Sequence, residues 1–247
     1  MSFRANVRKI LHSFGYDISA YAKDSCGRNA FLDMRRFVSD DSFTTVFDVG
    51  ANEGQFLETL RLHFPRCKVY SFEPGPKTYE ILRAKSARMD NVTTWNCGLG
   101  ADRGSAMLLE NSQSVMSSIL ELGEKGWGKI ERQTEISIRT VDEFCEEQGI
   151  ERVDILKTDT QGFDLEVLKG CKRMMSENRI GLIYSEVNFA ELYKNLPPFD
   201  EFFKYMRESQ FLLVAIFKMY YIQEVAGWAD ALFVNKALLD TKVNRQL

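Results

Sequence analysis

The fold is decided by the stretch Thr44-Thr45-Val46-Phe47-Asp48-Val49-Gly50-Ala51-Asn52-Glu53-Gly54-Gln55. A short apolar run rises to an acidic residue and then breaks into a turn that contains two glycines. An amphipathic run over residues 56–64 follows, so the stretch predicts a strand, a turn and a helix. Because glycine has no Cβ, the backbone of such a turn can approach a ligand closely.

The next segment along the chain repeats this arrangement. Residues 68–72 predict a second strand, which ends in Glu73. An acidic residue at the tip of the neighbouring strand can accept hydrogen bonds from both hydroxyls of a ribose. The two segments together predict a nucleoside-bearing cofactor at the strand ends.

Strands and helices alternate along most of the chain. After the first two strands we expect strands at 92–96, 153–159, 180–185, 211–217 and 228–235, with helices at 54–63, 77–88, 140–148, 165–175 and 199–209. This order predicts an α/β, doubly wound, seven-stranded and mostly parallel sheet, with an antiparallel last strand. The carboxyl ends of the parallel strands then share one edge of the sheet.

Three further segments complete the predicted organisation. Residues 1–40 predict an N-terminal helical extension, and residues 41–247 predict the main domain. Within the extension, residues 1–20 predict an amphipathic helix that packs on the domain or a partner subunit; binding to a membrane surface is the less favoured alternative. Residues 105–110 and 134–139 suggest a hairpin, and the polar residues 111–129 between them predict a long mobile loop.

Composition excludes several classes of protein. A net charge of −3 over 247 residues argues against a nucleic-acid partner, which a basic surface would attract. The five cysteines form no Cys-x-x-Cys pair, so we expect reduced thiols, no zinc site and a cytoplasmic location. No apolar run is long enough to predict a transmembrane span.

The glycine turn also discriminates between cofactors. A dinucleotide turn requires three glycines, whereas only Gly50 and Gly54 are present here. Glu53 would also place a carboxylate near the diphosphate. S-adenosylmethionine carries no phosphate and is cationic, which suits an acidic strand end such as Asp48.

Several separate motifs together carry a resemblance to a known family. They are Val46–Gly54, Val69–Pro74, Asn96–Gly100, Ser117-Ser118, Thr140–Phe144 and Ile155–Gly170. With these motifs the chain resembles the FkbM family of S-adenosylmethionine-dependent class I methyltransferases, which have a Rossmann-like fold. The resemblance implies O-methylation of a sugar, glycan or polyketide-like small molecule. The chain departs from the usual motif at Thr158 and Thr160, which flank Asp159, and at Asp164, where the family commonly has Glu.

Methyl transfer to an aliphatic hydroxyl requires a base or a metal that stabilises the alkoxide. Of the two histidines, His63 lies at the far end of the first core helix, and His12 lies outside the core sheet, from where only the N-terminal helix could bring it to the site. Asp159, which ends the fourth core strand, is the expected base. Glu186 is a second catalytic candidate, and Lys157 either pairs with an acid or takes part in catalysis.

The same strand ends suggest a metal site. Asp159, Glu186 and Asn188 would form an oxygen-rich set suited to a divalent metal such as Mg²⁺. In the alternative, Glu186 accepts backbone hydrogen bonds or pairs with Lys157. The sequence leaves the two open.

The remaining candidate residues fall into two sets. Cofactor binding is expected of Asp48, Gly50, Ala51, Asn52, Gly54, Glu73, Pro74, Asn96, Cys97 and Asp159. Contact with a small-molecule or glycan hydroxyl acceptor is expected of Ser117, Ser118, Gln161 and Asn188. The sequence leaves a homo-oligomer open.

Two other functions compete with O-methylation. N-methyltransferases usually carry a Pro-Pro motif directly after the fourth strand, but Leu196-Pro197-Pro198-Phe199 lies beyond the fifth strand here. A non-catalytic cofactor-binding scaffold is the third possibility. The joint presence of Asp48, Gly50, Gly54, Glu73 and Asp159 argues against it.

Overall fold

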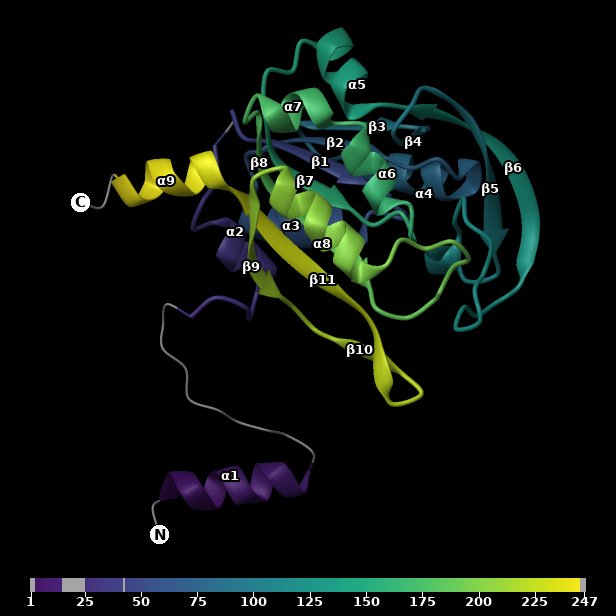
Figure 1. Cartoon of the computed structure of the whole chain (residues 1–247). Helices are drawn as coiled ribbons and strands as arrows, with labels where there is room; N and C mark the ends of the chain where they lie inside the picture. The colour runs from purple at the N-terminus through teal and green to yellow at the C-terminus, as the bar shows by residue number, and fades with distance from the viewer. Residues whose placement is uncertain (1–2, 15–24, 42, 245–247) are drawn as a thin grey trace.

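The computed structural model of the chain describes residues 3–14, 25–41 and 43–244. Its main sheet has the strand order β10-β11-β8-β7-β1-β2-β3, and β9 also pairs with β11 (Figure 1). The strands are β1 Thr45–Val49, β2 Lys68–Phe72, β3 Val92–Trp95, β7 Val153–Thr158, β8 Ile180–Asn188, β9 Phe211–Ile216, β10 Tyr220–Ile222 and β11 Val225–Asn235.

The five consecutive strands from β8 to β3 in this order are parallel, and β11 runs antiparallel to its neighbours. This confirms the predicted mostly parallel sheet with an antiparallel last strand. The predicted sixth strand, residues 211–217, is β9, and β10 is a further short strand that the sequence did not predict; both pair with β11. The ladder between β9 and β11 shifts register at Leu232/Phe233, and residues 217–219 lie outside both strands. Among the described residues, the sheet therefore has eight strands rather than seven.

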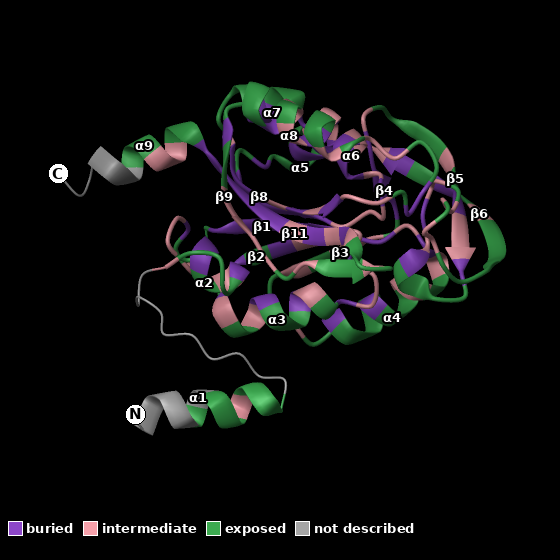
Figure 2. Cartoon of the chain, turned by 60° about the horizontal axis from the view of Figure 1, so that its bottom comes forward, coloured by how far each residue is buried: buried purple, intermediate pink, exposed green. Residues whose placement is uncertain are grey.

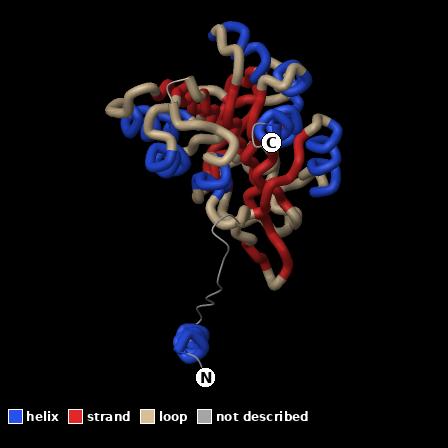
Figure 3. Tube along the Cα trace, turned by 90° about the vertical axis from the view of Figure 1, so that its left-hand side faces the viewer, coloured by secondary structure: helices blue, strands red, loops and turns tan. Residues whose placement is uncertain are grey.

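Helices cover both faces of the sheet (Figures 2 and 3). One face carries α2 Ala30–Met34, α3 Gln55–His63 and α4 Pro76–Ser86; the other carries α5 Val141–Gln148, α6 Asp164–Lys169, α7 Lys172–Ser176 and α8 Phe199–Glu208. Neighbouring residues of β1 serve opposite faces, since Val46 packs in the cluster with Leu57 of α3 and Phe47 packs in the cluster with Phe144 of α5. The central strand β1 is thus buried on both sides.

A second, smaller sheet has the order β4-β6-β5, with β4 Gly98–Leu99, β5 Gly104–Asn111 and β6 Ile130–Arg139. The antiparallel pairing of β5 with β6 is the predicted hairpin. The segment between them contains the short 3₁₀ helix η1, Ser114–Met116. Isolated bridges attach this segment at Leu109↔Ser118 and Leu122↔Tyr193. The segment is therefore attached by backbone bridges to β5 and to the loop that contains Tyr193.

One predicted helix is interrupted. Residues 165–175 were expected to form a single helix, but α6 ends at Lys169 and α7 begins at Lys172. A Cβ on Gly170 would lie 2.0 Å from the carbonyl oxygen of Gly100, and the Gly170 carbonyl accepts a hydrogen bond from the Asp142 backbone. Contacts of Gly170 with Gly100 and Asp142, which are distant in sequence, therefore interrupt the helical hydrogen bonds at this point.

At the N-terminal end, α1 spans Phe3–Ser13, and the predicted helical residues 15–20 lie outside the described part of the chain. At the other end, α9 spans Lys236–Asn244, where the sequence analysis predicted no helix. None of the helices in the described residues has the length and apolar character that crossing a membrane requires. The division into a helical extension, residues 1–40, and a main domain stays a prediction.

Candidate active site

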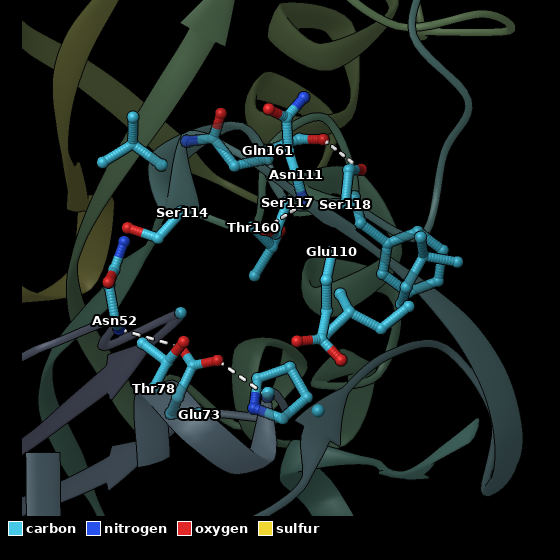
Figure 4. A pocket seen from close by; sticks show the side chains of 18 of the residues that line it. Asn52, Glu73, Thr78, Glu110, Asn111, Ser114, Ser117, Ser118, Thr160 and Gln161 are labelled. Carbon is cyan, nitrogen blue, oxygen red and sulfur yellow. Dashed lines mark hydrogen bonds between the residues drawn. The ribbon is translucent and has the colours of Figure 1, made fainter. Parts of the chain in front are cut away.

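A cavity of about 460 Å³ lies between the two sheets (Figure 4). Its floor consists of residues that follow β1, β2 and β7, including Gly50, Glu73 and Asp159. Its roof consists of residues of the smaller sheet and the adjoining segment, including Leu108 and Ser117. The crevice at the carboxyl ends of parallel strands is the usual ligand site in such folds.

The glycine turn lies against the loop that follows β7. Gly50 has φ +72°, and a Cβ there would lie 2.0 Å from the carbonyl oxygen of Asp159. The Asp159 backbone in turn donates to the Val49 carbonyl at 3.1 Å. Asn52 also has a positive φ of 47°, and its buried Oδ1 has no hydrogen-bond partner. The turn thus leaves an acceptor available beside the cavity.

Glu73 connects the turns after β1 and β2. Its carboxylate accepts hydrogen bonds from the Asn52 backbone at 2.9 Å and the Gly75 backbone at 2.8 Å (Figure 4). Burial raises the pKa of Glu73 to about 7, although these two hydrogen bonds act in the opposite direction. The carboxyl group is therefore a titratable part of the cavity floor near neutral pH.

Lys157 and Asp48 form an ion pair beneath the turn. The Nζ atom of Lys157 lies 3.0 Å from Oδ1 of Asp48 and donates to the carbonyl oxygens of Val49 at 3.2 Å and Gly50 at 2.7 Å. Burial alone would lower the pKa of Lys157, but attraction to the Asp48 and Asp159 carboxylates raises it. Neither Lys157 nor Asp48 is among the residues that line the cavity. The structure therefore places both below the site.

Asp159 reaches the cavity, with 41% of its side chain exposed. Gln161 Nε2 donates to its Oδ1 at 2.7 Å, and Lys157 Nζ lies 3.8 Å from its Oδ2. Both carboxylate oxygens are thus held by cationic or N–H groups. The carboxylate lies in the same cavity as the glycine turn and Glu73.

The predicted acceptor residues separate in space. Ser117, Ser118 and Gln161 line the cavity, but Ser118 Oγ is already engaged, since it donates to the Gln161 carbonyl at 2.7 Å. Ser117 Oγ accepts from the Asn111 backbone at 3.0 Å. Asn188 lies elsewhere, in a second cavity of about 20 Å³.

Five predicted cofactor residues do not line the main cavity: Asp48, which lies below the turn, and Ala51, Gly54, Asn96 and Cys97. The Asn96 amide instead donates to the carbonyl oxygens of Glu73 at 2.9 Å and Pro74 at 3.0 Å, so it supports the loop after β2. Gly98 and Leu99 of β4 line the cavity in their place.

Glu186 shares the small second cavity with Asn188, whose amide donates to Glu186 Oε1 at 3.3 Å. Burial, followed by repulsion from the Asp159 and Asp164 carboxylates, raises the pKa of Glu186 well above its usual range. In the residues that the structure describes, no group of three or more His, Cys, Asp or Glu side chains is arranged to hold a metal ion. Of the predicted Mg²⁺ ligands, Asp159 lines the main cavity, whereas Glu186 and Asn188 line the small second cavity.

Sequence reasoning missed the polar side chains of the roof. Glu110 of β5 and Arg132 of β6 line the cavity and form an ion pair at 3.4 Å. They belong to no motif, and only the predicted hairpin hinted at their position. Tyr193, which contacts Gln161, also belongs to no motif, and no sequence signal indicated it.

Comparison with known proteins gives one family and several relatives. The Methyltransferase FkbM domain family matches residues 48–213. The 2-O-methyltransferase NoeI of Sinorhizobium fredii is 25% identical over 62% of this chain and 67% of its own. Methyltransferase sdnD of Sordaria araneosa is 29% identical over 51% and 59%. Hexuronic acid methyltransferase AglP of Haloferax volcanii is 28% identical over 63% and 58%. The matches thus span less than two thirds of the length of sdnD and of AglP.

Proposed function

The chain belongs to the FkbM family of S-adenosylmethionine-dependent methyltransferases, and we propose that it methylates a hydroxyl of a sugar, glycan or polyketide-like small molecule. One observation carries the proposal. The Asp159 carboxylate, fixed by Gln161 and Lys157, faces the same cavity as the glycine turn and Glu73. A cofactor subsite and a basic group are therefore adjacent.

The floor of the cavity fits S-adenosylmethionine. Glu73 would accept hydrogen bonds from the ribose hydroxyls, and the unpartnered Oδ1 of Asn52 would accept from the amino group. The carboxylates of Glu73 and Asp159 suit a cationic ligand, and the absence of a side chain at Gly50 keeps the turn in contact with the β7 loop. When bound, S-adenosylmethionine supplies an electrophilic methyl group on a sulfonium.

Asp159 is proposed to take the proton of the acceptor hydroxyl, which makes the oxygen nucleophilic. Lys157 stays below the turn, where it holds the position of the Asp159 carboxylate rather than reacting. The roof residues confine the acceptor so that its oxygen can be aligned for displacement, and alignment of this kind lowers barriers strongly.

The relatives support a sugar as the acceptor. NoeI is named a 2-O-methyltransferase and AglP a hexuronic acid methyltransferase. The cavity volume, about 460 Å³, lies within the range of small-molecule sites. The cytoplasmic location and the oligomeric state stay predictions.

The competing functions receive less support from the site. Pro197 and Phe199 of the Pro-Pro segment line the small cavity beside Glu186 and not the main one. N-methylation would require this segment beside the Asp159 carboxylate. For a non-catalytic scaffold, no advantage would follow from holding Asp159 at both oxygens.

The test is transfer of isotope-labelled methyl from S-adenosylmethionine to methyl glycosides of neutral hexoses, 6-deoxyhexoses and hexuronic acids and to polyketide hydroxyls, read by mass spectrometry and NMR. Label on a hydroxyl oxygen supports the proposal. The panel also includes an amide-bearing acceptor, and label on its nitrogen favours N-methylation instead. Binding of S-adenosylmethionine by calorimetry without transfer to any acceptor points to a scaffold.

A further inference from the structure

We propose that Tyr193 is a positioning residue for catalysis, which acts through Gln161 on the Asp159 carboxylate. The inference rests on the proposed role of Asp159 and goes beyond it, because Tyr193 belongs to none of the sequence motifs and comes from the segment after β8.

A chain of two short hydrogen bonds connects the three side chains. The Tyr193 hydroxyl donates to Gln161 Oε1 at 2.6 Å, and Gln161 Nε2 donates to Asp159 Oδ1 at 2.7 Å. The direction of both bonds is fixed by the carboxylate, which can only accept. The Gln161 amide must therefore present its NH₂ to Asp159 and its oxygen to Tyr193.

Without the tyrosine hydroxyl, the Gln161 amide oxygen would lose its donor, and only the bond to Asp159 would hold the amide. The NH₂ group would then be held less firmly in place against the Asp159 carboxylate. Tyr193 is fully buried, at 0% exposed, so water does not compete for its hydroxyl. A hydrogen bond shielded in this way is stronger than one at the surface.

The backbone of Gln161 is constrained as well. Gln161 has φ +55° and Gly162 has φ +92°, a left-handed pair that an L-residue such as Gln adopts at a cost. Ser118 Oγ donates to the Gln161 carbonyl at 2.7 Å and stabilises this conformation from the roof (Figure 4). Gln161 is thus held at its backbone by Ser118 and at its side chain by Tyr193.

Packing of the tyrosine ring is separable from its hydroxyl. The ring belongs to a small apolar cluster with Met116 and Leu192, and Met116 Sδ lies 3.6 Å from the hydroxyl oxygen. Tyr193→Phe retains the ring and removes the donor. Tyr205→Phe is a matched control, because the Tyr205 hydroxyl donates to the Leu168 carbonyl at 3.1 Å, away from the cavity-lining residues.

The experiment compares both variants with the wild type. For Tyr193→Phe we expect kcat about 10-fold lower, with the Kd of S-adenosylmethionine by calorimetry changed less than about twofold. The pH profile of kcat should change, because Gln161 is no longer held in one orientation beside the proposed base. The two NH₂ protons of Gln161 should also change their NMR shifts. Tyr205→Phe should leave kcat, the pH profile and the Gln161 signals unchanged.

A lower melting temperature for Tyr193→Phe, with kcat, pH profile and Gln161 signals as in the wild type, would overturn the inference and leave Tyr193 a packing residue. The NMR arm needs no acceptor, so it separates this inference from the proposed function. A wild type that transfers no methyl group refutes the proposed function and with it a catalytic role for Tyr193, whereas the NMR arm then reports whether the hydrogen-bond chain exists.

Discussion

Lys157 Nζ lies 3.0 Å from Oδ1 of Asp48, and both side chains are buried directly beneath the glycine turn. The ammonium also binds two carbonyl oxygens of the turn. A buried charge that loses its partner is costly, whereas a pair replaced by neutral groups is often tolerated. The conformation of the glycine turn therefore depends on the ion pair between Lys157 and Asp48.

Lys157→Met should lower the free energy of unfolding by about 3–5 kcal/mol, because Asp48 would be left buried without its counterion. Adding Asp48→Asn to the same chain should recover part of that loss. Urea unfolding of the single and double variants measures both effects. If Lys157→Met has wild-type stability but no turnover, Lys157 instead has a direct catalytic role.

Gly50→Ala should destabilise the protein by about 3 kcal/mol or more, since the new Cβ overlaps a carbonyl oxygen and the backbone has positive φ. Gly104→Ala is the matched control, because a Cβ at Gly104 meets nothing within 4 Å. Its stability should stay within about 0.5 kcal/mol of the wild type. Thermal unfolding of both variants decides the point, and equal melting temperatures would contradict the close approach at Gly50.

Asp159→Asn should lower kcat by about 10²–10⁴-fold, because an amide cannot take the hydroxyl proton. Binding of S-adenosylmethionine should persist, since Glu73 and the glycine turn are unchanged. Steady-state methyl transfer and calorimetry measure the two quantities. Asp102→Asn, an exposed aspartate outside the cavity lining, serves as the control. Unchanged turnover in Asp159→Asn would remove Asp159 as the base.

Glu73 should make stability depend on pH. Its pKa is raised from 4.5 to about 7 in the folded chain, so the folded state binds the proton more tightly than the unfolded state. Its contribution to stability is present below pH 4.5 and is lost as pH rises through about 7, a change of about 3 kcal/mol. Glu73→Gln should flatten this fall in denaturant unfolding between pH 4.5 and 8. An identical pH slope in both proteins would show that Glu73 titrates normally.

The floor of the site could be predicted from sequence because its signals are local. Gly50, Glu73 and Asp159 each follow a strand directly, and parallel strands bring their ends to one edge. The contact between Tyr193 and Gln161 joins two loops whose sequences have no periodicity, so no sequence pattern predicts it. The break at Gly170 depends on its contact with Gly100, which a helical pattern in residues 165–175 cannot reveal.

The roof of the cavity is one uninterrupted insertion, because β4, β5, η1 and β6 all fall between β3 and α5 in the chain. The groups proposed to bind the cofactor and take the proton come from outside this insertion. A chimaera that exchanges residues 98–139 for those of a relative would therefore replace the roof and preserve the chemistry beneath it. Ser118 and Leu122 are the positions to retain in such a graft, since they join the insertion to Gln161 and Tyr193. Under the proposed function, exchange of this single segment should change the acceptor preference and leave cofactor binding in place.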